Sequence, residues 1–289
     1  MTKTLINQII QRVYETSQLN FFESLQLPLE PMWQPPITGY AAGNDPLFGF
    51  LRDDIGDFYW LPSEVYEKSN PSQELQSHDE TLTVVSIGFS QTAATKKDQA
   101  GAREIPCDKW LVTRGEWEAF IKDYCQRLVA ALSDEGIEAV AVDLLPSLQR
   151  ENSIRYGFAS NWSHRHTAFV AGLGTFGLSE GLITRQGKAM RFTSLVVKAT
   201  LPADERKYRN HQEWCAFHAN GTCGACMYRC PVNAITPAGH DKNRCSDYLN
   251  RLKKELGPSL LTQSHYISGC GLCQTKVPCQ DGIPAGLAR

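Results

Sequence analysis

No apolar run in the sequence approaches the ~20 residues that a membrane-spanning helix requires. The first residues, MTKTLINQIIQRVYET, have neither the apolar stretch nor the small-residue cleavage site of a secretory signal. Internal repeats and low-complexity tracts are absent as well. These absences argue against a membrane-spanning protein and a repeat architecture, and we expect a globular protein of the cytoplasm without membrane contact.

Cysteine is scarce in the first 214 residues, where only Cys107 and Cys125 occur. Cys125 lies beside the apolar stripe of a predicted helix and is expected to be a packed core thiol. The other eight cysteines crowd between residues 215 and 279. Because disulfides are rare in a reducing cytosol, this concentration indicates metal or redox chemistry.

The segment TCGACMYRCPVNAI (222–235) carries the last three cysteines of the bacterial ferredoxin run C-x2-C-x2-C-x3-C-P. Asn220 occupies the position of the first cysteine. A second segment, GCGLCQTKVPCQDGIP (269–284), has C-x2-C and then a gap of five residues before Cys279. Each segment therefore departs from the simple run by one ligand position.

Eight cysteines match two [4Fe–4S] clusters with four thiolates each. In two-cluster ferredoxins the last cysteine of a run ligates the other cluster, so the cysteine before Pro231 is assigned to the second cluster. Cys245, in the predicted helix 241–256, completes that cluster, and the two displaced cysteines complete the first. Cluster one then has Cys215, Cys223, Cys226 and Cys279, and cluster two has Cys230, Cys245, Cys270 and Cys273. A zinc site on the two C-x2-C pairs is the alternative, and it leaves four cysteines without a role.

The composition changes near residues 202–210, because residues 206–289 carry 11 Lys and Arg against 5 Asp and Glu. A basic segment can bind nucleic acid, but its cations can also offset the negative charge of thiolate-ligated clusters, which we favour. The change predicts a core over residues 1–205 and a two-cluster, ferredoxin-like domain over residues 206–289.

Strand and helix patterns alternate in the first 205 residues. Residues 81–89, 137–145 and 191–201 are strand-like, residues 115–136 have the apolar period of a helix, and the proline-rich residues 27–36 are expected to be irregular. The core is therefore predicted to be α+β, or α/β-like.

The segment AGLGTFG (171–177) contains G-x-G-x-x-G, which can bind a dinucleotide when a strand precedes it and a helix follows it. NWSHRHTAFV precedes it and no clear long helix follows, so this use is not favoured.

The stretch AGLGTFGLSEGLITRQGKAMRFTSLVV (171–197), followed by a cysteine run ending in CP, a lone cysteine and C-x2-C-Q, resembles epoxyqueuosine reductase. The reductive dehalogenases have the same order of motifs. The resemblance covers roughly residues 80–289 and implies a core related to nitroreductases, a base-off cobalamin and two [4Fe–4S] clusters that reduce its cobalt. Epoxyqueuosine reductase carries out the last step of queuosine synthesis on tRNA, and dehalogenases remove halide from organohalides.

Two core residues are candidate proton donors. VDLLPSLQRE (142–151) keeps Asp143 and Pro146 of the motif in which the family's Asp is the proposed donor, and Asp143 also ends the apolar strand-like segment IEAVAVD. A buried carboxyl that holds its proton near neutral pH can act as a general acid; the alternative for Asp143 is a turn or helix cap. Tyr156 is a second candidate, since dehalogenases use a tyrosine in this way.

The cofactor or substrate cavity is predicted from two neighbouring segments. Gly172, Gly174 and Gly177 would let the backbone approach a large planar cofactor. Asn161, His164 and Arg165 would line the cavity, with Arg165 meeting an anionic group; the alternative is that these histidines and their neighbours are simply solvated or hydrogen-bonded. No D-x-H-x-x-G stretch is present, so the cobalamin module with an axial histidine is not indicated.

These features together predict an oxidoreductase. We expect reduced ferredoxin or flavodoxin to supply electrons, which pass through the two [4Fe–4S] clusters to a corrinoid that reduces a small molecule or a modified tRNA nucleoside. Two alternatives stay open: epoxyqueuosine reduction on tRNA itself, and a ferredoxin-type electron carrier or corrinoid-reducing activator of a partner protein.

Overall fold

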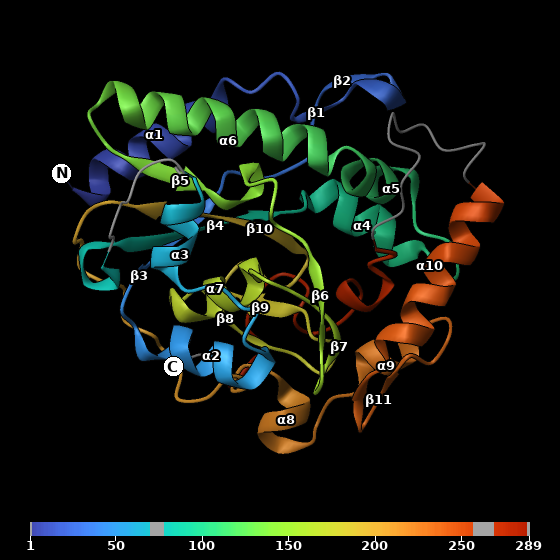
Figure 1. Ribbon diagram of the computed structural model, residues 1–289. Coiled ribbons are helices and arrows are strands. Elements are labelled where there is room, and N and C mark those ends of the chain that lie inside the picture. Colours follow the sequence, from blue (N-terminus) through green and yellow to red (C-terminus); the bar gives the residue numbers. More distant parts are fainter. Residues whose placement is uncertain (1, 70–77, 257–268, 288–289) are drawn as a thin grey trace.

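A four-stranded sheet lies at the centre of the computed structural model, which describes residues 2–69, 78–256 and 269–287 (Figure 1). Its strands follow the order β3-β4-β10-β5, and each pairs with its neighbours in antiparallel fashion. The bounds are β3 Ile37–Ala42, β4 Thr83–Ser90, β5 Ala139–Ala141 and β10 Met190–Val197. The predicted mixture of strands and helices is confirmed, and the antiparallel pairing makes the core α+β.

Helices cover both faces of this sheet, because successive strand residues point to opposite sides. Val85 and Leu195 pack with α1 (Lys3–Glu15) and α6 (Trp117–Asp134). On the other face, Val84 and Val196 pack with α2 (Pro46–Ile55), α3 (Pro62–Lys68) and α7 (His164–Val170). Figure 1 shows these two helical layers on either side of the strands. The two central strands, β4 and β10, are therefore buried on both sides.

The remaining elements are short. Before the cysteine-rich part they are β1 Phe21–Phe22, β2 Leu27–Pro31, α4 Ala93–Gly101, α5 Asp108–Gly115, β6 Arg150–Ser153, β7 Gly157–Ser160, β8 Gly174–Phe176 and β9 Leu182–Thr184, with the 3-10 turns η1 Glu23–Leu25, η2 Asp79–Thr81 and η3 Val142–Leu144. In the cysteine-rich part they are α8 Ala216–Asn220, α9 Ala225–Arg229, β11 Ile235–Thr236, β12 Gly239–His240, α10 Lys242–Leu256 and η5 Leu272–Gln274.

The apolar periods locate the main elements to within a few residues. The helix predicted over 115–136 is α6, with Cys125 fully buried as expected, and Gly136 adopts a positive φ of 70° just after its end. The strand predicted over 137–145 is too long, because the chain leaves the sheet after Ala141 and turns through η3. Residues 27–31 were expected to be irregular, and this was wrong, because they form β2 beside β1.

The cysteine-rich part packs against one end of the core (Figure 1). The Trp110 indole of α5 donates to the Gly269 carbonyl at 3.1 Å, and the Gln99 amide of α4 donates to the Cys270 carbonyl at 2.7 Å. Leu178 and Ile183 of the core share an apolar cluster with Trp214. Among the described residues, no helix is long and apolar enough to cross a membrane.

Candidate functional site

Four cysteines from three separate segments line one cavity beside the core. Cys215 immediately precedes α8, Cys226 lies in α9, and Cys279 comes from the C-terminal segment. The lining also includes Cys223, and β8–β9 contributes Gly177 and Ile183 together with Leu178 between them. These are the four cysteines that the sequence assigns to cluster one; we call them the Cys215 group.

The other four cysteines influence one another electrostatically. Cys273 and Cys230 both raise the pKa of Cys245, to about 11, although burial is the main cause. Burial also raises the pKa of Cys270, and Cys273, Cys245 and Cys230 add to the effect. Cys230 ends α9, Cys245 lies in α10 and Cys273 lies in η5. Arg229 Nε, next to Cys230, donates to the carbonyl of Leu272, next to Cys273, at 3.2 Å, and Cys270 packs with Tyr248 and Leu252 of α10. We call the four cysteines assigned to cluster two the Cys230 group.

An all-sulfur donor set suits iron–sulfur clusters. Burial raises the pKa of the Cys226 thiol to about 11, and a metal that binds such a thiol removes its proton. Among the described residues, no three His, Cys, Asp or Glu side chains converge closely enough to hold one metal ion. A cubane does not require such convergence, because each of its four irons takes a different thiolate. The Cys215 group, arranged around a cavity, fits this demand.

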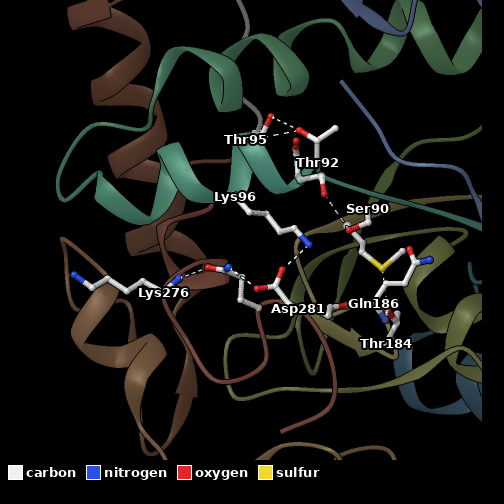
Figure 2. Close-up of polar contacts among 12 residues, drawn as sticks. Ser90, Thr92, Thr95, Lys96, Thr184, Gln186, Lys276 and Asp281 are labelled. Atoms are coloured by element: carbon white, nitrogen blue, oxygen red, sulfur yellow. Dashed lines mark hydrogen bonds and ion pairs between the residues drawn. The ribbon is translucent and has the colours of Figure 1, made fainter. Parts of the chain in front are cut away.

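Core contacts fix the segment that supplies Cys279, as Figure 2 shows. Lys96 of α4 is only 5 % exposed, and its Nζ lies 2.6 Å from Asp281 Oδ1. The Gln280 side chain donates to the other oxygen of Asp281 at 2.7 Å. Gly187 has a φ of 89°, and a Cβ at this position would lie 1.9 Å from the Gln280 carbonyl oxygen. The core backbone therefore approaches the segment closely, and only glycine permits that approach.

The glycine stretch serves a β-hairpin. Helix α7 precedes it and the β8–β9 hairpin follows, which is not the strand-then-helix context of a dinucleotide site. A Cβ on Gly174 would lie 2.2 Å from the Ile183 carbonyl oxygen, and one on Gly177 would lie 3.3 Å from the Ile183 side chain. Gly172 has a φ of 81° at the turn after α7. Hairpin packing therefore accounts for Gly174, and the protein itself fills the space next to it.

Asp143 lies on η3, where its carboxylate contacts two core side chains. Thr193 Oγ1 donates to Oδ2 at 2.5 Å, and His164 Nε2 lies 3.2 Å from the same oxygen. Burial raises the pKa of Asp143, but the nearby His164, Thr193 and Arg191 outweigh it, so the net shift is downward. The prediction of a proton-donating carboxyl required the opposite shift. These contacts therefore favour an ionised Asp143 beside His164, and its role as a proton donor stays a prediction.

His164 links Asp143 to the sheet. Its Nδ1 lies 2.9 Å from Ser194 Oγ, which also accepts a hydrogen bond from the Trp162 indole at 2.8 Å. Ser194 is fully buried, whereas the His164 side chain retains 17 % of its exposure. Asn161 is buried, and its amide binds the segment after Asp143: it donates to the Ser147 carbonyl at 2.8 Å and accepts from the Gln149 amide at 3.0 Å. Asn161 therefore positions that segment.

A charged cluster lies between α7 and the cysteine-rich part. Arg165 donates to the Glu180 carbonyl at 2.5 Å, and His240 Nδ1 lies 3.2 Å from Glu180 Oε2. Arg165 is exposed to solvent despite this hydrogen bond. Burial and Arg165 lower the pKa of His166 to about 3, so His166 is neutral at pH 7. Arg165 is thus available to an anion.

Tyr156 lies in the turn of the β6–β7 hairpin, and its contacts are different from those of Asp143. Its hydroxyl donates to Asp54 Oδ2 at 2.6 Å, and its backbone carbonyl accepts from Lys242 Nζ at 3.2 Å. Burial and the Asp54 carboxylate raise the pKa of Tyr156 to about 12. The hydroxyl proton of Tyr156 is therefore engaged in a hydrogen bond to the Asp54 carboxylate of α2.

Several residues of this region carried no signal in the sequence. In the sequence, Thr193 and Ser194 look like ordinary strand residues. In the structure, Ser194 contacts His164 and Thr193 contacts Asp143. Glu180 has a φ of 57°, which is uncommon for a residue other than glycine, and it follows the G-x-G-x-x-G stretch closely in sequence. Lys188 lines the cavity of the Cys215 group and gave no motif at all.

Comparisons with known proteins agree with these features. No family model matches the chain. Over 111 residues it is 33% identical to an epoxyqueuosine reductase of Leadbetterella byssophila, a match that covers 37% of this chain and about a third (34%) of that relative. A selenomethionine-labelled epoxyqueuosine reductase matches with a TM-score of 0.52 and 16% identity, covering 98% of this chain and 68% of the other. An epoxyqueuosine reductase solved with an epoxyqueuosine-modified tRNA-Tyr stem loop gives 0.51 and 15%, covering 98% and 67%.

These matches bear directly on the resemblance that the motifs predict. The curated relative is similar in sequence to part of the chain, and the solved structures share the fold over nearly all of it. The resemblance is confirmed: in sequence and in fold, this chain is similar to the epoxyqueuosine reductases.

Proposed function

We propose that this protein is an iron–sulfur reductase in which two [4Fe–4S] clusters deliver low-potential electrons to a cofactor and substrate held by the core. The observation that carries the proposal is the arrangement of eight cysteines in two groups of four beside the core. Residues 206–289 then form a ferredoxin-like domain on a nitroreductase-related core. Reduced ferredoxin or flavodoxin is the proposed electron donor.

The two clusters are proposed from the cysteine groups in the structure, and the corrinoid is proposed on different grounds. The Cys215 and Cys230 groups would hold the clusters, which supply electrons one at a time. Cobalamin is proposed from the family resemblance alone, and its cobalt would supply the reducing centre. The glycine stretch does not offer the predicted cradle, because Ile183 fills the space beside Gly174. Arg165 and His164, which are both accessible, are the residues we place towards the cofactor or substrate.

The order of electron flow follows from the neighbours of each group. Helix α10, which carries Cys245, begins beside the core: Lys242 Nζ donates to the Tyr156 carbonyl at 3.2 Å, and His240 lies 3.2 Å from Glu180 of the charged cluster beside α7. The Cys230 group therefore lies next to the part of the core that carries Arg165, so electrons would pass from the Cys215 group to the Cys230 group and then to the core. Protons would come through His164, whose Nε2 lies 3.2 Å from the Asp143 carboxylate.

Elemental analysis tests the proposal. The protein is expressed without oxygen and with cobalamin supplied, and iron, cobalt and zinc per chain are measured together. We expect about eight iron, and about one cobalt if the corrinoid is bound, because two cubanes hold eight irons. Iron without cobalt would favour the electron carrier or activator. Zinc in place of iron would contradict the proposal.

The β6–β7 hairpin favours tRNA as the substrate carrier. The Arg150 guanidinium lies 5.5 Å from the centre of the Phe158 ring, and Arg155, whose side chain is 67 % exposed, lies 5.2 Å from the Tyr156 ring. Ile154 between them is fully exposed. Arginines paired with aromatic rings can contact phosphates and stack on bases. An epoxyqueuosine reductase of similar fold has been solved with a bound tRNA stem loop, and this supports tRNA binding as a second candidate function.

Replacing Arg150 with glutamate should weaken tRNA binding about tenfold at low salt, because a phosphate contact becomes a repulsion. Phe158→Ala should weaken binding with little change in its salt dependence, since stacking is not ionic. Affinities for a modified tRNA stem loop, measured at several salt concentrations, provide the readout. Arg12→Glu, an exposed arginine on α1, is the control. Equal affinities for all three variants and the native protein would rule the hairpin out as the tRNA contact.

A further inference from the structure

A lysine is buried between the two cysteine groups. Lys188 lies in the turn between β9 and β10, and only 2 % of its surface is exposed. Lysine is almost never fully buried without a partner, because its charge loses the hydration of water. No carboxylate is among the described groups that raise its pKa. Its charge is therefore balanced by something other than an acidic side chain.

Lys188 contacts Ser179 and the backbone of Cys279. Its ammonium donates to Ser179 Oγ at 3.0 Å, and its backbone N–H donates to the Cys279 carbonyl at 3.0 Å. Lys188 also lines the cavity around which the four cysteines of the Cys215 group are arranged. The lysine is therefore held beside the Cys215 group.

The Cys230 group has a cation of its own. Arg229 directly precedes Cys230, and its Nε donates to the carbonyl of Leu272, next to Cys273, at 3.2 Å. Loss of Lys188 should therefore disturb the Cys215 group more than the Cys230 group.

We propose that Lys188 sets the reduction potential of the cluster at the Cys215 group, as a fixed positive charge that Ser179 holds beside the cavity of this group. This inference rests on the proposed function, because it needs that cluster. Reduction adds one negative charge to a cluster, and a cation beside its thiolates stabilises that charge and raises the potential. Lys188 is a positioning residue for electron transfer and carries no electron itself.

The test is a redox titration of the anaerobic full-length protein, followed by EPR, with dithionite as reductant. In Lys188→Met, at the potential that half-reduces the cluster of the Cys215 group in the native protein, we expect the reduced-to-oxidised ratio to fall about tenfold, or about 59 mV for one electron. The other cluster should shift less. Lys188→Arg should restore most of the shift. Arg185→Met removes an exposed charge three residues away and should change neither potential.

The possible outcomes test the Lys188 inference and the proposed function separately. If the native protein holds about eight iron and both potentials of Lys188→Met equal the native values, the Lys188 inference is wrong while the clusters stand. If the native protein holds no iron, the proposed function itself fails. If Lys188→Met loses its iron, Ser179→Ala replaces it, because it releases the ammonium from its partner. A lower potential for the Cys215 group then supports the inference, and unchanged potentials overturn it.

Discussion

Alanine at position 215 is expected to lower the iron content from about eight to about four per chain, because it removes one of four thiolates from one cubane. Cys215 is buried and lines the same cavity as Cys223, Cys226 and Cys279. A fixed buried ligand has no neighbour that can replace it without moving the chain. The loss should therefore affect one EPR signal completely and leave the other cluster in place.

Pairs of substitutions test the grouping more sharply than single ones. Cys215→Ala combined with Cys223→Ala removes two ligands of one group, and we expect about four iron to remain. Cys215→Ala combined with Cys245→Ala removes one ligand from each group, and almost no iron should remain. If both double variants keep the same amount of iron, the grouping of the eight cysteines is wrong.

Cys107→Ala is the matched control. Cys107 is half-buried, directly before α5, and the charges that influence its pKa after burial are those of Asp98, Asp108 and Lys109. No cysteine is among the causes of its shift. This variant should keep about eight iron and both EPR signals. Loss of iron here would mean that the cysteine substitutions act through folding and not through ligation.

The sequence could predict the cysteine groups because ligand spacing is a local property. Cys223, Cys226 and Cys230 keep the interval of a ferredoxin run, and the crossing of its last cysteine follows from that run alone. The structure places Cys215 and Cys279 in one cavity with the first two, although 64 positions separate them in the chain. The remaining two cysteines were grouped by elimination, and their role as ligands of one cluster stays a prediction.

The environment of the core residues could not be predicted in this way. Asp143 was recognised at the end of a strand, but its ionisation depends on His164 and Thr193, which tertiary structure alone brings near. Lys188 was missed because a buried lysine looks like any surface lysine in the sequence. Gly174 was predicted to face a cofactor, whereas it permits β9 to approach. Contacts between residues far apart in the sequence thus set the charge and the solvent access of these core residues. Local spacing identifies only the candidate cluster ligands.

Asp143→Asn should slow substrate reduction by about 10²–10⁴-fold, the usual contribution of general acid–base catalysis. The amide keeps the shape of the side chain and can still accept from Thr193, but it removes the negative charge that lies 3.2 Å from His164 Nε2. The readout is a single turnover of an epoxyqueuosine-modified stem loop by the pre-reduced protein. His164→Gln should be as slow, and the double variant should be no slower than either, because the two residues act as one unit. Asp134→Asn, an exposed change at the end of α6, should be fully active.

The same pair predicts a pH dependence that can be measured without a substrate. The pKa of Asp143 in the folded protein lies below its ordinary value of about 3.9, so its stabilising effect is complete above that value and disappears as the pH falls through the folded pKa. At pH 7, Asp143→Asn should therefore unfold more easily than the native protein, by about 1–3 kcal/mol in denaturant titrations. The difference should vanish in strongly acidic solution. A difference that is constant from pH 7 to pH 3 would show that folding leaves the pKa of Asp143 unshifted. A difference that grows as the pH falls from 7 to 4 would show a raised pKa, and would return Asp143 to the role of a protonated donor.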